Sequence, residues 1–266
     1  VVGVEKAFDW TYVEKRLNES FSRSRHAVLT VSLHYPGQNL FLPQFIWDKQ
    51  PTLLYYPDFM GGGVSPDYGD PIILKAIEQF IRAFGAKYDG DTRIGFIHLG
   101  LLGFWGEWHT FPQNFVPEHA KHSVTQWYTE SFSKTQLQAR YPFDPTYKAG
   151  MGLYDGSFAF HTLDGDANGG FYHPEWYFWP LVQAAGQSDI WKKAALGGET
   201  RPELQKEIFT SSYQKGTYEK QDFVRCIYTT HATYIFHQDA FILGGYTGEQ
   251  LAAAAHSHTR MGYSFI

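Results

Sequence analysis

Glu107 is the residue of this sequence whose neighbours best suit acid–base chemistry. It stands between Trp105 and Trp108, and His109 follows. Indole rings keep water away from a carboxyl group, and this desolvation raises the pKa of a carboxyl towards the value that a general acid needs at neutral pH. The alternative is a structural role, in which Glu107 caps a helix or pairs with an arginine. The aromatic neighbours favour the catalytic role.

Glu199 is the best partner for Glu107, because it follows a predicted strand that ends in Gly197-Gly198. Arg201, if it lies close, would keep Glu199 ionised and nucleophilic. Pro202-Glu203 suits the first turn of a helix and is assigned that structural role. Hydrolysis of a glycosidic bond needs two carboxyl groups, one to protonate the leaving oxygen and one to attack the sugar or activate water. The pair therefore predicts a glycoside hydrolase.

These carboxylates need a scaffold, and the sequence predicts an α/β fold. Short apolar strands alternate with helical segments, which is typical of parallel βα units. Strands are expected at 27–35, 93–102, 149–154, 194–197, 233–237 and 261–266, with 52–56 as a seventh. Helices are expected at about 9–21, 72–84, 117–135, 175–185, 201–211 and 248–256. With a length of 266 residues, this pattern predicts one domain over residues 1–266, a (β/α)8 TIM-type barrel.

In such a barrel, the catalytic and binding groups lie on the loops that follow the strands. Polar residues follow nearly every predicted strand, whereas the amino-terminal sides of the strands carry nothing comparable. Nine of these residues are expected to bind sugar hydroxyls, stack on sugars or tune charge: His34, Tyr35, Trp105, Trp108, His109, Asp155, Arg201, His237 and Tyr263. Trp105 and Trp108 are the expected stacking walls. Aromatic residues make up 18% of the chain, which favours an aromatic-lined cleft for a carbohydrate.

One segment matches the spacing of a calcium-binding loop. The residues that would supply oxygen ligands are Asp164, Asp166, Asn168 and Glu175. Pro174 precedes the glutamate and no clear helix leads into the loop, so a turn rich in Asp and Asn is favoured over calcium. No other metal is expected, because the twelve histidines show no tight ligand spacing and suit hydrogen bonds to sugar hydroxyls. No cofactor is required.

Composition and charge exclude several other functions. The net charge of -5 argues against a nucleic-acid partner, and no apolar run approaches the roughly 20 residues that span a membrane.

Cys226 is the single cysteine, so no intrachain disulfide is expected, and its apolar neighbours predict burial. The chain starts at Val1 without Met and ends on an apolar strand. We therefore expect a piece of a longer precursor, with a barrel incomplete at one or both termini. Nothing in the sequence predicts an oligomeric state.

Most of the chain resembles an uncharacterised family of glycosidase-like (β/α) barrels found in secreted bacterial and fungal proteins. The resemblance rests on the stretch Gly-x-x-Gly-Phe-Trp-Gly-Glu-Trp-His and on residues 154–158, 197–199 and 261–265. The chain is also similar to the large retaining-glycosidase clan, whose acid/base and nucleophile are strand-end glutamates. This similarity implies a secreted enzyme with Glu107 as acid/base and Glu199 as nucleophile. In that clan the two glutamates lie three strands apart, whereas the strands expected here give two steps.

Two other functions fit the same scaffold. In a polysaccharide lyase, a tyrosine or histidine would remove a proton beside a uronic carboxylate, and Arg201 would neutralise that carboxylate. A non-catalytic sugar-binding barrel would keep its affinity after loss of both glutamates. The sugar-binding barrel is the least favoured of these functions, because a binder has little need for two carboxylates at separate strand ends. The sequence leaves the lyase open beside the hydrolase.

Overall fold

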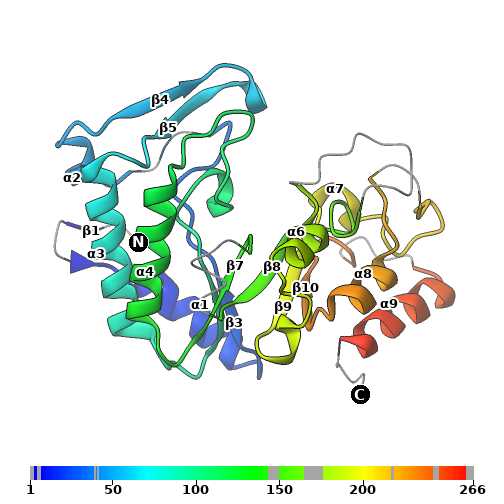
Figure 1. The fold of residues 1–266 in the computed structure, drawn as a ribbon. Coiled ribbons are helices and arrows are strands. Elements are labelled where there is room, and N and C mark those ends of the chain that lie inside the picture. Colours follow the sequence, from blue (N-terminus) through cyan, green and yellow to red (C-terminus); the bar gives the residue numbers. More distant parts are fainter. Residues whose placement is uncertain are drawn as a thin grey trace. The chain divides into compact units, whose positions relative to one another are not determined.

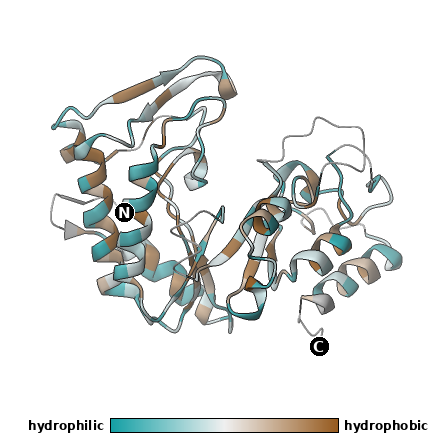
Figure 2. Ribbon diagram, viewed as in Figure 1, coloured by the Kyte–Doolittle hydropathy of each residue, from teal (hydrophilic) through white to brown (hydrophobic). Residues whose placement is uncertain are grey.

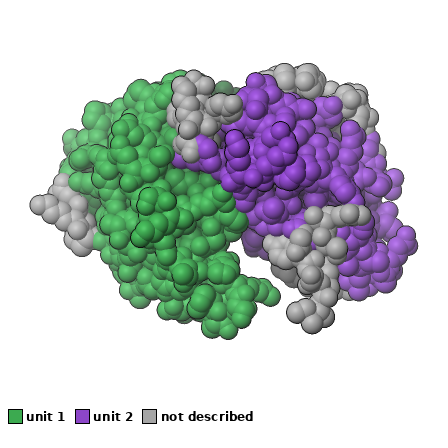
Figure 3. Space-filling model, turned by 60° about the horizontal axis from the view of Figure 1, so that its bottom comes forward, with its two compact units in different colours: residues 1–138 green, residues 139–266 purple. Residues whose placement is uncertain are grey.

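The computed structural model describes residues 3–4, 7–38, 40, 42–142, 150–164, 176–216, 219–241 and 246–261 (Figure 1). The chain divides into two compact units, residues 1–138 and 139–266 (Figure 3). Among the described residues, each unit combines helices with three parallel strands. The predicted α/β class with parallel strands is therefore confirmed.

The three parallel strands of unit 1 are β3 (Ala27–Leu29), β6 (Ile94–His98) and β7 (Gln136–Ala139), and β6 lies in the middle. Leu29 is aligned with Ile97, and His98 with Gln138. Side chains at aligned positions of parallel strands project to the same face of a sheet. Two predictions for these strands were wrong. β3 and β6 end several residues earlier than expected, and β7 was not expected at all.

The helices of unit 1 include α1 (Thr11–Phe21), α3 (Pro71–Tyr88) and α4 (Glu118–Ser131), and hydrophobic and hydrophilic bands alternate along α3 (Figure 2). The helix expected at about 72–84 is present as α3, which starts one residue earlier at Pro71, and the Asp70 carboxylate caps it by accepting a hydrogen bond from the Ile72 amide at 2.7 Å. The helix also continues beyond its expected end at 84, as far as Tyr88. Gly85 lies inside α3, where a Cβ atom would collide with the carbonyl oxygen of Ser131 in α4.

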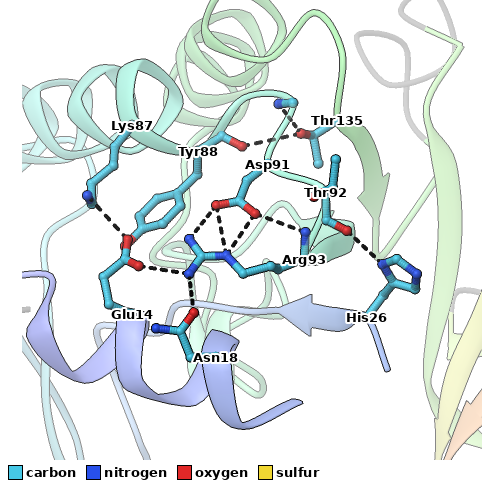
Figure 4. A network of polar contacts seen from close by, with 10 residues as sticks. Glu14, Asn18, His26, Lys87, Tyr88, Asp91, Thr92, Arg93 and Thr135 are labelled. Carbon is cyan, nitrogen blue, oxygen red and sulfur yellow. Dashed lines mark hydrogen bonds and ion pairs between the residues drawn. The ribbon is translucent and has the colours of Figure 1, made fainter. Parts of the chain in front are cut away.

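A polar network fastens α1 to the amino-terminal end of β6 (Figure 4). Arg93 donates from Nη1 to Glu14 at 2.9 Å and to Asn18 at 2.7 Å, and from Nε to Asp91 at 3.0 Å. The Arg93 guanidinium also holds the pKa of the Glu14 carboxyl below its usual value. This network lies at the opposite end of β6 from His98 and therefore serves the packing of unit 1.

The β4–β5 hairpin of unit 1, formed by β4 (Leu53–Tyr56) and β5 (Gly63–Pro66), is antiparallel (Figure 1). A strand was expected at 52–56 and is present as β4, but its antiparallel partner excludes it from the set of parallel strands. A short helical turn, Phe59–Gly61, forms the tip of the hairpin. Other short elements of unit 1 include α2 (Gln44–Trp47), the helical turn Phe104–Gly106 and the pair β1 (Gly3–Val4) and β2 (Ala7–Phe8).

In unit 2 the parallel strands are β8 (Gly152–Phe158), β9 (Leu196–Thr200) and β10 (Tyr234–Phe236), and β9 lies in the middle. The described α-helices of this unit are α6 (Phe178–Ala184), α7 (Pro202–Gln205), α8 (Phe223–Thr230) and α9 (Gly248–Arg260). Cys226 lies in α8 and is fully buried, as expected. α7 is much shorter than the predicted helix at 201–211, and most of the strand expected at 261–266 falls outside the described residues.

The order of the strands along the chain bears on the two glutamates. Because β7 lies between β6 and β8, β9 is the third strand after β6, and the expected two steps were wrong.

Among the described helices, none has both the length and the apolar character needed to cross a membrane.

Candidate active site

The Glu107 loop, which we define as residues 99–110, is built on unusual backbone conformations. Leu101, Trp105 and Trp108 have φ angles of 73°, 54° and 67°, in the left-handed region that side chains with a Cβ rarely adopt. Backbone hydrogen bonds hold them there: the Leu101 amide donates to Val31 at 2.7 Å, and the Trp105 amide to His34 at 2.9 Å. Strained residues held in this way often occur at functional sites.

Glu107 and His109 form the central contact of this loop. The Nε2 atom of His109 lies 3.3 Å from a carboxylate oxygen of Glu107, and their side chains are 30% and 20% exposed. The amide of Phe111 donates to Nδ1 of His109 at 3.4 Å, so the proton of the neutral ring lies on Nε2. His109 therefore donates a hydrogen bond to the Glu107 carboxylate, which is positioned and still reached by solvent.

The two tryptophans beside Glu107 have different roles. Trp108 is only 5% exposed, and its indole N–H donates to the Leu99 carbonyl at 2.5 Å. The expectation that Trp108 forms a stacking wall is therefore corrected: its left-handed φ turns the ring into the core. Trp105 is partly exposed, and its ring meets that of the half-exposed Tyr35 edge-on at 6.4 Å.

Phe59 joins this aromatic group and was missed by the sequence analysis. Its ring lies 5.9 Å from that of Trp105 and stacks on Phe104 at 5.2 Å. It comes from the tip of the β4–β5 hairpin, and no local pattern in the sequence links that tip to the Glu107 loop. Trp105, Tyr35 and Phe59 together offer the flat apolar rings on which a sugar ring can stack.

His34 is a buried residue that supports the Glu107 loop from the core. It is 1% exposed, and its Nε2 atom lies 3.1 Å from the hydroxyl of Tyr56, which is itself fully buried. Burial lowers the pKa of His34 to about 4, so the ring is neutral at pH 7. Its backbone carbonyl accepts a hydrogen bond from the Trp105 amide. His34 was expected to contact substrate, but its ring is buried and packs against the rings of Tyr56 and Phe104.

His98 is a second residue that the sequence analysis missed. It is the last residue of β6, and its Nδ1 atom lies 2.8 Å from the hydroxyl of Thr30, which follows β3. Burial lowers the pKa of His98 to about 4, while a hydrogen bond with Gln138 and the charge of Glu107 act in the opposite direction. The expected strand at 93–102 placed His98 in its interior and so concealed it as a strand-end residue.

In unit 2, Asp155 is fully buried in β8. Its carboxylate accepts hydrogen bonds from the Ser157 amide at 2.9 Å and the Thr162 hydroxyl at 2.7 Å, and Nη1 of Arg140 lies 3.5 Å away. Asp155 was expected to bind substrate. Its burial and its partners instead give it a role in holding the loop that follows β8.

Glu199 is half-buried and lies within β9, opposite Phe236 of β10, whereas the sequence predicted a position after the strand. Arg201 donates to Glu203 at 2.7 Å and covers the ring of Phe160 at 4.4 Å. The guanidinium expected to tune Glu199 thus forms an ion pair with Glu203.

The remaining predicted site residue of unit 2 within the described part is His237. Its Nε2 atom lies 3.2 Å from Nε2 of His258 in α9, and burial lowers the pKa of His237 to about 4. The rings of Phe209 and Phe241 each lie 5.7 Å from it, so His237 belongs to an aromatic cluster. Tyr263 lies outside the described residues.

The predicted calcium loop lies largely outside the described residues, because Asp166, Asn168 and Glu175 fall there. Across the described part of the chain, no group of three or more His, Cys, Asp or Glu side chains is arranged to hold a metal ion. The favoured turn and the calcium alternative for this segment both stay predictions.

Glu107 belongs to unit 1 and Glu199 to unit 2, so the pairing of the two carboxylates also stays a prediction. No protein-family model matches this sequence, and no curated protein is significantly similar to it.

Proposed function

We propose that the chain is the catalytic domain of a secreted glycoside hydrolase that acts on an oligo- or polysaccharide. The observation that carries the proposal is the contact between Glu107 and His109 beside the exposed edge of the aromatic group. A carboxylate open to solvent, a hydrogen-bond donor and flat apolar rings are combined in one loop after a parallel strand. This combination suits protonation of a glycosidic oxygen on a stacked sugar.

In the proposed reaction, Glu107 is the acid/base and Glu199 the nucleophile. Glu107 gives its proton to the departing sugar oxygen while Glu199 attacks the anomeric carbon, and the glycosidic bond breaks. Glu107 is then ionised, and the Nε2–H of His109 stabilises the new carboxylate. In the second step, Glu107 takes a proton from water, and the water oxygen displaces Glu199 from the sugar.

We propose a (β/α)8 TIM-type barrel as the scaffold of this reaction. Its support is the succession of parallel strands and helices in both units, with Glu107 after β6 and His237 after β10. The position of β9 as the third strand after β6 agrees with the spacing of the two glutamates in the retaining-glycosidase clan.

The first test is hydrolysis of a panel of polysaccharides, with release of reducing ends as the measurement. Glu107→Gln is expected to lower kcat on natural glycosides by about 10²–10⁴-fold, because the leaving oxygen loses its proton donor. The loss should be much smaller on an aryl glycoside whose leaving group needs no proton. Glu118→Gln is the matched control, since Glu118 is exposed and forms only a surface pair with Lys121.

The second test is capture of the covalent intermediate with a slow fluorosugar substrate, followed by peptide mass spectrometry. The label is expected on Glu199. Full turnover by Glu107→Gln on natural glycosides would contradict the acid/base role. An unsaturated product detected by ultraviolet absorbance would identify a lyase, and binding without any product would identify a sugar-binding protein.

A further inference from the structure

Asn18 begins the triplet Asn18-Glu19-Ser20, which has the Asn-x-Ser pattern that accepts N-linked glycans. The other asparagines of the sequence, Asn39, Asn114 and Asn168, have neither Ser nor Thr two positions later. Such triplets are frequent by chance, and the surroundings of Asn18 distinguish this one. A glycan is bulky and hydrated, so the asparagine that carries it must lie at the surface with an accessible amide nitrogen.

The amide nitrogen of Asn18 meets this requirement. Asn18 lies on the exposed side of α1. Its Oδ1 atom accepts a hydrogen bond from Nη1 of Arg93 at 2.7 Å, and Nδ2 is turned away from the guanidinium (Figure 4). Among the described residues, none forms a hydrogen bond with Nδ2. Nδ2 is the atom that bonds to the sugar, so the acceptor atom is open to solvent.

A glycan on Nδ2 is also compatible with the polar network around Arg93. N-glycosylation replaces one of the two protons of Nδ2 and leaves the carbonyl oxygen in place. Oδ1 therefore still accepts from Arg93, and α1 stays fastened to the start of β6. Arg93 directly precedes β6, whereas Glu107 follows the carboxyl end of this strand. The glycan would therefore lie at the opposite end of β6 from the Glu107 loop.

We propose that Asn18 is an N-glycosylation site whose glycan leaves the packing of α1 against β6 intact. This inference rests on the secreted location in the proposed function. In the transfer, Nδ2 attacks the anomeric carbon of an oligosaccharide that is linked to a lipid diphosphate. A C–N bond forms, the C–O bond to the diphosphate breaks, the lipid diphosphate leaves, and one Nδ2 proton is released to solvent. Transfer acts on the nascent chain before it folds, so α1 constrains only whether the modified residue fits.

The first test is expression of the full chain behind a secretion signal in a eukaryotic host that adds high-mannose N-linked glycans. Chain recovered from cells and medium is expected to exceed the mass of the polypeptide by one glycan, and peptide mass spectrometry should locate the glycan on Asn18. Ser20→Thr keeps the acceptor pattern and should keep the glycan, whereas Ser20→Ala should lose it. An unmodified Asn18 in the wild type would overturn the inference.

The second test compares stabilities. An endoglycosidase that leaves one N-acetylglucosamine on Nδ2 gives a uniform modified chain, whose midpoint of urea denaturation should match that of the unmodified chain made in a bacterial cytosol. Asn18→Ala removes Oδ1 from Arg93 and should unfold at a lower urea concentration. A modified chain destabilised as much as Asn18→Ala would also overturn the inference. Neither test depends on turnover, so both can fail while hydrolysis is observed, and absence of hydrolysis leaves both readable.

Discussion

The indole N–H of Trp108 donates to the carbonyl of Leu99, and this single bond ties the residue after Glu107 to the residue after β6. Trp108→Phe keeps an aromatic ring in the core but leaves the Leu99 carbonyl without this donor. A buried unsatisfied carbonyl costs about 1–3 kcal/mol, so the free energy of unfolding should fall by that amount. Urea denaturation measures the change. Trp191→Phe, at a more exposed indole in the other unit, is the control, and equal stability of both variants would refute the role of the bond.

Because α3 and α4 cross closely at Gly85, we predict that alanine at this position destabilises the protein, although alanine normally stabilises a helix relative to glycine. Within a helix, glycine to alanine normally stabilises by about 1 kcal/mol. Gly85→Ala should instead lower the free energy of unfolding, because its Cβ would collide with the Ser131 carbonyl. The neighbouring exposed Ala86 provides the matched comparison, since Ala86→Gly should cost only the helix-propensity difference of about 1 kcal/mol. If Gly85→Ala instead raised the free energy of unfolding, α3 and α4 would have to move apart at little cost to make room for the Cβ atom, and the prediction would be wrong.

Acid should destabilise unit 1 in a defined pH window. Burial lowers the pKa of both His34 and His98 to about 4, below the value of about 6.5 for an unfolded histidine. The unfolded state therefore binds more protons between these values, and the free energy of unfolding falls as the pH falls from about 6.5 to about 4. The slope of the unfolding midpoint against pH measures this effect.

His34→Gln tests the origin of that slope. Glutamine cannot titrate, so the variant should show a shallower loss of stability over the same pH window, whatever its stability at pH 7. His256→Gln is the control because His256 is exposed, and its slope should match the wild type. If all three proteins share one slope, buried His34 does not contribute to it.

How far the sequence predicts this fold depends on how local each signal is. The helix expected at about 72–84 is present as α3, because its apolar residues recur at helical spacing within one short segment. β7 was missed because Gln-Leu-Gln-Ala contains no apolar run, and Gln138 is buried through contacts with a neighbouring strand. Long-range pairing carries the information that single-sequence patterns lack.

The same distinction applies to the candidate site. The contact of Glu107 with His109 follows from two residues in one tight loop, and the sequence placed both in the site. The burial of Trp108 depends on its φ angle, and the position of Phe59 depends on a hairpin more than forty residues earlier, so neither was predicted.

The histidine pair between β10 and α9 predicts a pH-dependent contact. Nδ1 of His258 donates to the Ala254 carbonyl at 2.7 Å, so its Nε2 accepts the proton of His237 Nε2. An added proton must then appear on Nδ1 of His237, which is buried and has no partner among the described residues. Hydrogen exchange in α9 should therefore accelerate, relative to its intrinsic rate, as the pH falls towards 4.

His237→Phe tests this contact, because phenylalanine fits the surrounding aromatic cluster and cannot titrate. The protection of α9 in this variant should not change between pH 7 and pH 5, whereas the wild type should lose protection. A matching pH dependence in both proteins would assign the effect to other groups.

The aromatic group predicts how substrate length affects binding. Trp105→Ala removes the ring that contacts both Tyr35 and Phe59, and loss of stacking on one sugar should raise KM by about 10-fold, with a smaller effect on kcat. The Trp105 ring packs on His109, the partner of Glu107, whereas the Phe59 ring contacts Trp105 from the hairpin tip. Phe59→Ala should therefore raise KM only for longer oligosaccharides. Kinetics on an oligosaccharide series separate these outcomes. Equal increases for both variants on the shortest substrate would mean that Phe59 acts by supporting Trp105 and does not contact a sugar of its own.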